Sequence, residues 1–219
     1  MSVEATALKL ESKGSTSGLL RTRIVGLIAA TAVSILVSAS VWFLASVLPS
    51  KTGSPFAPIR EICQWIYHSS IGVGIRESVL LFPVIEGVHL LGIGLSVGLL
   101  CWFDLRLLGV VMTQEPISKV WQRVMPSAFA GFVLMFITGG LLFWAEAATA
   151  YDSLHFWIKM ALILLAGINA GYFELSTHKH MSEWDSEIVP PMRARLAGLT
   201  SLVLWTAVIV TGRTMAYAF

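Results

Sequence analysis

The sequence predicts an all-α integral membrane protein with five transmembrane helices, and three observations indicate this fold class. Hydrophobic residues make up 56% of the 219-residue chain and charged residues only 13%, whereas about a quarter of the residues in a soluble domain are charged. The mean hydropathy is +0.76. Five stretches reach the length of about 20 mostly apolar residues that a helix needs to cross a bilayer. The second to fifth helices are expected to form an antiparallel bundle.

The five predicted spans cover about residues 24–48, 79–102, 124–145, 154–173 and 196–217. The first contains 25 residues without a charge. Because this run is longer than the apolar core of a cleaved signal peptide, we expect a retained helix. Residues 1–20 are rich in Ser, Thr, Glu and Lys and predict a flexible cytoplasmic tail. Residues 21–219 then form a single membrane domain.

A short interfacial helix is predicted between the first and second spans, within residues 49–77. Ile59, Ile62, Trp65 and Ile66 recur at helical spacing, while the charged residues between them turn to another side. Such an amphipathic helix lies in the plane of the membrane interface. We place this one at the outer face.

Small residues within the spans indicate where helices pack, because lipid provides no hydrophobic force between helices and close backbone contact holds them together. Such contact is favoured by Gly94 and Gly98 in the second span, by Ala128, Gly131, Gly139 and Gly140 in the third, and by Ala166, Gly167, Ala170 and Gly171 in the fourth. Trp205 lies in the middle of the fifth span, away from both interfaces where tryptophan is enriched. We therefore expect it to pack inside the bundle.

Lysine and arginine residues predict the orientation, since cytoplasmic segments carry an excess of both. With the N-terminus inside, the cytoplasmic segments hold ten of these residues and the outer segments three. Asp104 and Arg106, at the inner end of the second span, are expected to anchor it and to contact neighbouring loops. The net charge of +2 and the absence of a long basic run argue against nucleic acid as a partner. The expected partners are the lipid bilayer and other membrane subunits or further copies of the chain.

Two titratable residues lie within the second span, in the stretch FPVIEGVHLLGIG. Glu86 and His89 are three residues apart, about 60° from each other on one helix face. Ionisable groups within a span normally face a bundle interior or a cavity. Histidine is the commonest metal and haem ligand, so the pair predicts a site with His89 as ligand and Glu86 as a metal ligand or as its hydrogen-bond partner. A structural histidine and a proton relay are the alternatives.

A second polar group starts the fourth span. Asp152 and His155 repeat the carboxylate-x-x-His spacing, and His155, Lys159 and Asn169 share one helix face. Lys159 could neutralise Glu86, bind an anionic group such as a haem propionate, or extend to the interface. Polar support within the membrane is expected from three further positions: Glu146, Asn169 and Arg213.

Whether His89 and His155 share one site depends on where the second helix begins. A start at Val79 places His89 about 15 Å along the helix, and a start at Pro83 places it about 9 Å along. Proline is favoured in the first turn. The later start makes a shared site feasible, and the sequence leaves the choice open.

The stretches EGVHLLGIGLSVGLLCWFDLRLLG and LHFWIKMALILLAGINAGYFE, within roughly residues 78–217, resemble a family of small bacterial inner-membrane proteins of unknown function. More remotely, a histidine near the start of one helix and a Trp-x-Lys near the start of a later one are similar to the copper-resistance D membrane domain. Its superfamily includes cytochrome b-like proteins, although its methionine-rich copper motifs are absent here. The resemblance implies a bacterial inner-membrane location with a periplasmic C-terminus, and a haem or metal site formed by His89, His155 and Lys159.

Three functions are compatible with these patterns. The first is a site for haem b, copper or iron near the outer face, with a role in electron transfer or metal handling. The second is a proton-coupled transporter, and the third is a non-catalytic subunit of a larger membrane complex. No hydrolase, kinase or nucleotide-binding signature is present, which leaves enzymatic activity open. We rank the first function ahead of the others.

Overall fold

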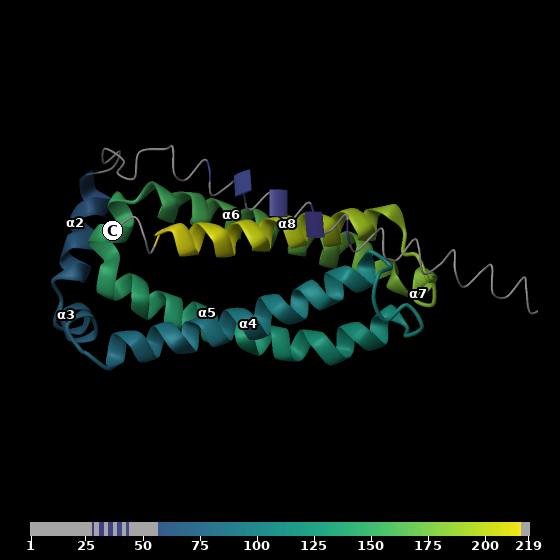
Figure 1. Ribbon diagram of the computed structural model, residues 1–219, viewed down its shortest axis with the longest axis horizontal. Helices are drawn as coiled ribbons and strands as arrows, with labels where there is room; N and C mark the ends of the chain where they lie inside the picture. Colours follow the sequence, from purple (N-terminus) through teal and green to yellow (C-terminus); the bar gives the residue numbers. More distant parts are fainter. Residues whose placement is uncertain are drawn as a thin grey trace, which may run out of the picture.

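The computed structural model describes residues 57–215 and eight single positions between residues 28 and 43. In this part of the chain, four helices are long and apolar enough to cross a membrane. They contain α4 (Leu81–Leu107), α5 (Ile117–Asp152), α6 (Leu154–Tyr172) and α8 (Met192–Met215). Figure 1 shows them running side by side along the long axis of the molecule. No strand occurs among these residues, so the all-α class is confirmed there.

The four helices correspond to the second to fifth predicted spans and extend beyond four of their eight ends, because the helical chain continues past its apolar part. The predicted first span, residues 24–48, lies outside the described residues apart from the eight single positions. The predicted tail, residues 1–20, lies wholly outside them. The count of five spans therefore stays a prediction.

α4 begins at Leu81, two residues before Pro83. The Ser78 hydroxyl oxygen accepts hydrogen bonds from the backbone N–H groups of Leu80 (3.4 Å) and Leu81 (3.0 Å), which satisfies donors at the helix start. Pro83 occupies the first turn, where its missing N–H is tolerated. His89 therefore lies about 12 Å along the helix, between the two depths considered from the sequence.

The long helices pack as two pairs. α4 packs mainly on α5, α6 packs mainly on α8, and α4 also contacts α8. By contrast, α5 and α6 contact each other little, although only Ser153 separates them in sequence. Trp205 of α8 is buried and packs on Phe132 of α5, with ring centroids 5.1 Å apart. Its predicted position inside the helix assembly is confirmed.

Of the predicted packing glycines, those of the third span include the one at the closest helix contact, Gly131. A Cβ on Gly131 of α5 would lie 2.8 Å from the backbone nitrogen of Ser96, and one on Gly92 of α4 would lie 3.4 Å from the Gly131 carbonyl oxygen. The prediction for Gly94, Gly98, Gly167 and Gly171 was wrong within the described part of the chain, where a Cβ on any of the four has open space. The reason is helix rotation: the face of α4 turned toward α5 carries His89, Gly92 and Ser96.

Two short helices, α2 (Ala57–Tyr67) and α3 (Ser70–Arg76), lie across one end of the long helices (Figure 1). α2 is the short helix that the sequence predicted between the first and second spans. Its Cys63 is buried against Ala147 and Tyr151 of α5, whereas Ile59, Ile62 and Trp65 are exposed. An apolar face is therefore turned away from the protein.

Arg76 fixes α3 to a kink in α5. The backbone of α5 leaves helical geometry at Glu146 (φ −119°, ψ 25°). The Arg76 guanidinium donates to the Ala145 carbonyl oxygen (2.8 Å) and to the Tyr67 carbonyl oxygen (3.1 Å). The kink is thus held by a side chain from the short helices.

The opposite end is closed by short turns between α6 and α8. A π-helix η1 (Phe173–Thr177), a 3₁₀ turn η2 (His178–His180) and α7 (Met181–Trp184) follow α6. Asp185 caps α5 by accepting hydrogen bonds from the Ser118 N–H (2.7 Å) and hydroxyl (2.8 Å). Arg106 of α4 donates to the Glu115 and Glu187 carbonyl oxygens, as the sequence predicted for its contacts with neighbouring loops.

Candidate functional site

His89 projects from α4 onto α5. Its Nδ1 atom lies 2.9 Å from the hydroxyl oxygen of Thr138. The imidazole ring rests on Gly139, where an added Cβ would lie 3.1 Å from the His89 Cε1 atom. The site therefore depends on a hydroxyl and a missing side chain at consecutive positions of α5.

The hydrogen bonds of Thr138 favour one tautomer of His89. A hydroxyl has a single hydrogen, and that of Thr138 is placed to donate to the Leu134 carbonyl oxygen at 2.7 Å. When it does so, the hydroxyl oxygen accepts from His89, and Nδ1 is the donor in that arrangement. The Met135 carbonyl oxygen, a second acceptor, also lies beside the ring. The neutral imidazole consequently keeps its lone pair on Nε2, the nitrogen left to bind a metal.

Lys159 of α6 lies in the same region. Its ammonium nitrogen and Cε are 3.7 Å from the position that a Cβ on Gly212 of α8 would take, and it is close enough to His89 for their charges to interact. No ion pair forms with Lys159 among the described residues. The predicted neutralisation by Glu86 is not seen there. The four long helices thus meet at His89, Thr138, Lys159 and Gly212.

Glu86 is half-buried on α4. Within the part of the chain that the structure describes, it forms no hydrogen bond or ion pair, and the partner of His89 is Thr138. Glu86 shares a face with His89 by spacing, but the ring of His89 turns onto α5. Glu86 was predicted to be the hydrogen-bond partner of His89. In the structure this partner is Thr138.

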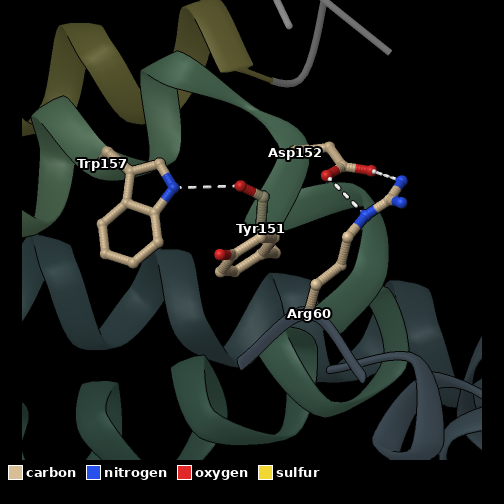
Figure 2. A network of polar contacts seen from close by, with 4 residues as sticks. All are labelled: Arg60, Tyr151, Asp152 and Trp157. Carbon is tan, nitrogen blue, oxygen red and sulfur yellow. Dashed lines mark hydrogen bonds and ion pairs between the residues drawn. The ribbon is translucent and has the colours of Figure 1, made fainter. Parts of the chain in front are cut away.

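His155 is buried in the first turn of α6, at 4% exposure. Figure 2 shows the corner that leads into it: Arg60 of α2 binds Asp152 through both carboxylate oxygens (3.3 and 3.0 Å), and the Trp157 ring N–H donates to the Tyr151 carbonyl oxygen (2.9 Å). Asp152, which spacing paired with His155, thus forms an ion pair with α2. This corner precedes α6, which begins at Leu154, so that His155 is its second residue.

The structure brings Lys159 close to His89. His155 precedes Lys159 by four residues, so that it lies about 6 Å nearer the start of α6. Residues 57–215 also contain no group of three or more His, Cys, Asp or Glu residues placed to hold a metal ion. The arrangement therefore provides one imidazole, that of His89, whose orientation is fixed by the contact with Thr138.

The three predicted supporting residues belong to three different helices. Glu146 accepts a hydrogen bond from the Thr149 hydroxyl (3.1 Å) at the kink in α5. Asn169 donates to the Ala197 carbonyl oxygen (3.0 Å) and so links α6 to α8. Arg213 is exposed in the last turn of α8.

Sequence reasoning missed Thr138, and it counted Gly139 only among the small residues that serve helix packing. A threonine or a glycine in an apolar span most often serves packing, so neither carries a signal of its own. The useful signal is their adjacency, a hydroxyl next to a residue without a side chain on a helix that faces a buried histidine.

Comparison with known proteins gives one match. A family model described as a family of unknown function (DUF6644) matches residues 62–218. No curated protein and no solved structure match the chain. The match covers α4, α5, α6 and α8 and most of α2.

Proposed function

The chain belongs to this family of unknown function, and we propose that it is a multi-pass protein of the bacterial inner membrane that holds haem b near the outer face. His89 is the proposed axial ligand, and Lys159 the proposed partner of a propionate. The proposal includes the five-span architecture with a cytoplasmic N-terminus and a periplasmic C-terminus, which the distribution of lysine and arginine supports.

The surface of the long helices supports a membrane location. Each of them exposes large apolar side chains on its outward face, among them Leu91, Phe129, Leu164 and Ile209. Water would make so much exposed apolar surface costly, and hydrocarbon makes it favourable. The exposed Ile59, Ile62 and Trp65 of α2 suit the interface at the outer end.

The single observation that carries the haem proposal is the contact of His89 Nδ1 with the Thr138 hydroxyl, 2.9 Å long. Haem iron binds the lone pair of a neutral imidazole nitrogen, usually with the other ring nitrogen donating a hydrogen bond. The bond from Nδ1 to Thr138 provides that donor and leaves Nε2 for the iron. This arrangement is the one expected of a ligand.

Lys159 favours haem over a bare metal ion. An ammonium group near a cation repels it, and the described residues supply no group of three or more ligating side chains that would offset this repulsion. Haem b carries two propionates, each able to accept hydrogen bonds from an ammonium group. When bound, it supplies one-electron exchange. The protein residues orient it, neutralise its carboxylate and hold the ligand nitrogen in place.

The test is a measurement of bound cofactor in detergent-purified protein. We expect a pyridine haemochrome typical of haem b in the wild type, and no stoichiometric copper. His89→Ala should lose the haem while keeping the elution volume and thermal unfolding profile of the wild type. A folded wild type that contains no haem after purification and binds no added haem would refute the proposal. Stoichiometric copper would also refute it and would favour a role in metal handling.

His155→Ala separates two versions of the proposal. If His155 is the second axial ligand, this variant should change from a six-coordinate low-spin to a five-coordinate high-spin spectrum. An unchanged spectrum would remove His155 from the site and leave His89 as the protein ligand.

A further inference from the structure

A second site lies in the inner half of the helix assembly. A cavity of about 410 Å³ is enclosed by α4, α5, α6 and α8. Seven aromatic side chains line it, including Phe103, Trp121 and Trp205, and its polar lining consists of Asp104, Asn169 and Ser201. None of His89, His155 and Lys159 contributes to the lining. The cavity is therefore separate from the proposed haem site.

Asp104 of α4 is the unusual group in this lining. Its side chain is 2% exposed, and Ser201 of α8 is its hydrogen-bond partner. The second carboxylate oxygen, Oδ2, is fully buried without a hydrogen-bond partner in the described part of the chain. A buried carboxyl group left unpaired costs free energy, and natural proteins normally pair it. The cavity beside Asp104 is where a partner can enter.

The exposed part of the cavity lining belongs to α5 and α6, which contact each other little, so the cavity opens between these two helices. Its lining residues there include Phe129, Phe136, Gly167 and Ala170, all of them exposed and without charge. In a membrane this side faces hydrocarbon. A ligand that reaches Asp104 by this route has to be lipophilic.

The chemistry of the lining selects the charge of that ligand. Among the described residues, no lysine, arginine or histidine lines the cavity, so that an anionic headgroup would find no partner there. A wholly apolar molecule would leave Asp104 unpaired. A cation pairs with the carboxylate, and the surrounding aromatic rings stabilise it further through their negatively charged faces.

We propose that this cavity binds a lipophilic monovalent cation, such as a hydrophobic ammonium compound, with Asp104 as its counter-ion. Ser201 holds one carboxylate oxygen of Asp104 and leaves Oδ2 for the ligand. Asn169 is already bonded to the Ala197 carbonyl oxygen through its side-chain nitrogen and keeps α6 at the wall of the cavity. The aromatic rings supply the apolar contact.

Tetraphenylphosphonium and tetraphenylborate test this proposal, because they share size and shape and differ in the sign of their charge. Equilibrium dialysis against the full chain in detergent, corrected for partition into empty micelles, should show saturable binding of the cation only. Asp104→Asn keeps the shape and the hydrogen bond to Ser201. It should weaken cation binding about 30-fold or more, the lower end for a desolvated charge pair.

A control variant and a check of folding accompany the binding measurement. Glu183→Gln removes an exposed carboxylate outside the cavity and should bind the cation like the wild type. Elution volume and thermal unfolding of Asp104→Asn should match the wild type, and Ser201→Ala provides a second variant at the site with an intermediate loss. Equal binding of both ions, full cation binding by a folded Asp104→Asn, or no cation binding by the wild type would each overturn the proposal. None of these outcomes depends on haem.

Discussion

The Nδ1 atom of His89 lies 2.9 Å from the Thr138 hydroxyl oxygen, and that hydroxyl donates its only hydrogen to the Leu134 carbonyl oxygen at 2.7 Å. These two hydrogen bonds join α4 to α5 and favour one tautomer of a histidine that is half-buried between helices. In that tautomer the lone pair of the imidazole is on Nε2.

Thr138→Val should weaken haem binding about 10- to 100-fold, the range for loss of a hydrogen bond to a ligating histidine. Valine keeps the shape of threonine but cannot accept from Nδ1, so the imidazole is free to rotate or to change tautomer. Haem titration followed by absorption measures the effect. Thr138→Ser restores the acceptor and should bind within a few-fold of wild type; equal losses in both variants would contradict the role of the hydroxyl.

Gly139→Val should displace the His89 ring, because even a Cβ at this position would lie 3.1 Å from Cε1. Gly140→Val is the matched control: it puts the same β-branched residue at the next position of α5, where a Cβ has open space. Both variants should fold, and only the first should lose haem. Similar haem content in the two variants would show that the ring does not rest on Gly139.

Gly131→Ala should destabilise the protein by about 1–3 kcal/mol, the usual cost of overpacking. The added Cβ would lie 2.8 Å from the backbone nitrogen of Ser96, which cannot move without shifting α4. Gly98→Ala fills open space and should be neutral or slightly stabilising, because alanine favours helix over glycine. Thermal unfolding in detergent compares them. A drop for Gly98→Ala alone would contradict the helix rotation described above.

The Cys63 thiol should react slowly with maleimide at neutral pH. Burial raises its pKa above the usual value, which is about 8.5, so the reactive thiolate is scarce. The raised pKa also affects the free energy of unfolding, because the folded state binds this proton more tightly than the unfolded state does. The stabilisation is fully present below the pKa of the thiol in the unfolded state. It is lost as the pH rises through the pKa of the thiol in the folded state.

A labelling series between pH 7 and about pH 10 checks this prediction on a Cys101→Ser background, with Cys63→Ser as the blank. Labelling should stay slow near pH 7 and accelerate above the pKa of an ordinary thiol. Rapid labelling at neutral pH would show that Cys63 is not buried against α5.

The four long apolar helices were predictable because crossing a bilayer depends on length and hydropathy, which the sequence displays directly. Which of the candidate glycines lie at helix contacts was not predictable, since it depends on how each helix is rotated. Spacing placed Glu86 and His89 on one face but could not identify Thr138, which is 49 positions away in sequence. Asp104 was expected to anchor a helix end. Its burial accompanies the close approach of α8, where a Cβ on Gly198 would lie 3.1 Å from the Asp104 carbonyl oxygen, and only the tertiary structure reveals this contact.

The most direct measurement is a hemin titration of purified apo-protein, followed at the Soret band, for the wild type and His89→Ala. We predict saturation at one haem per chain for the wild type. For His89→Ala we predict no saturable Soret band, while tryptophan fluorescence shows that the variant is still folded. Equal titration curves for the two proteins would contradict the assignment of His89 as the haem ligand.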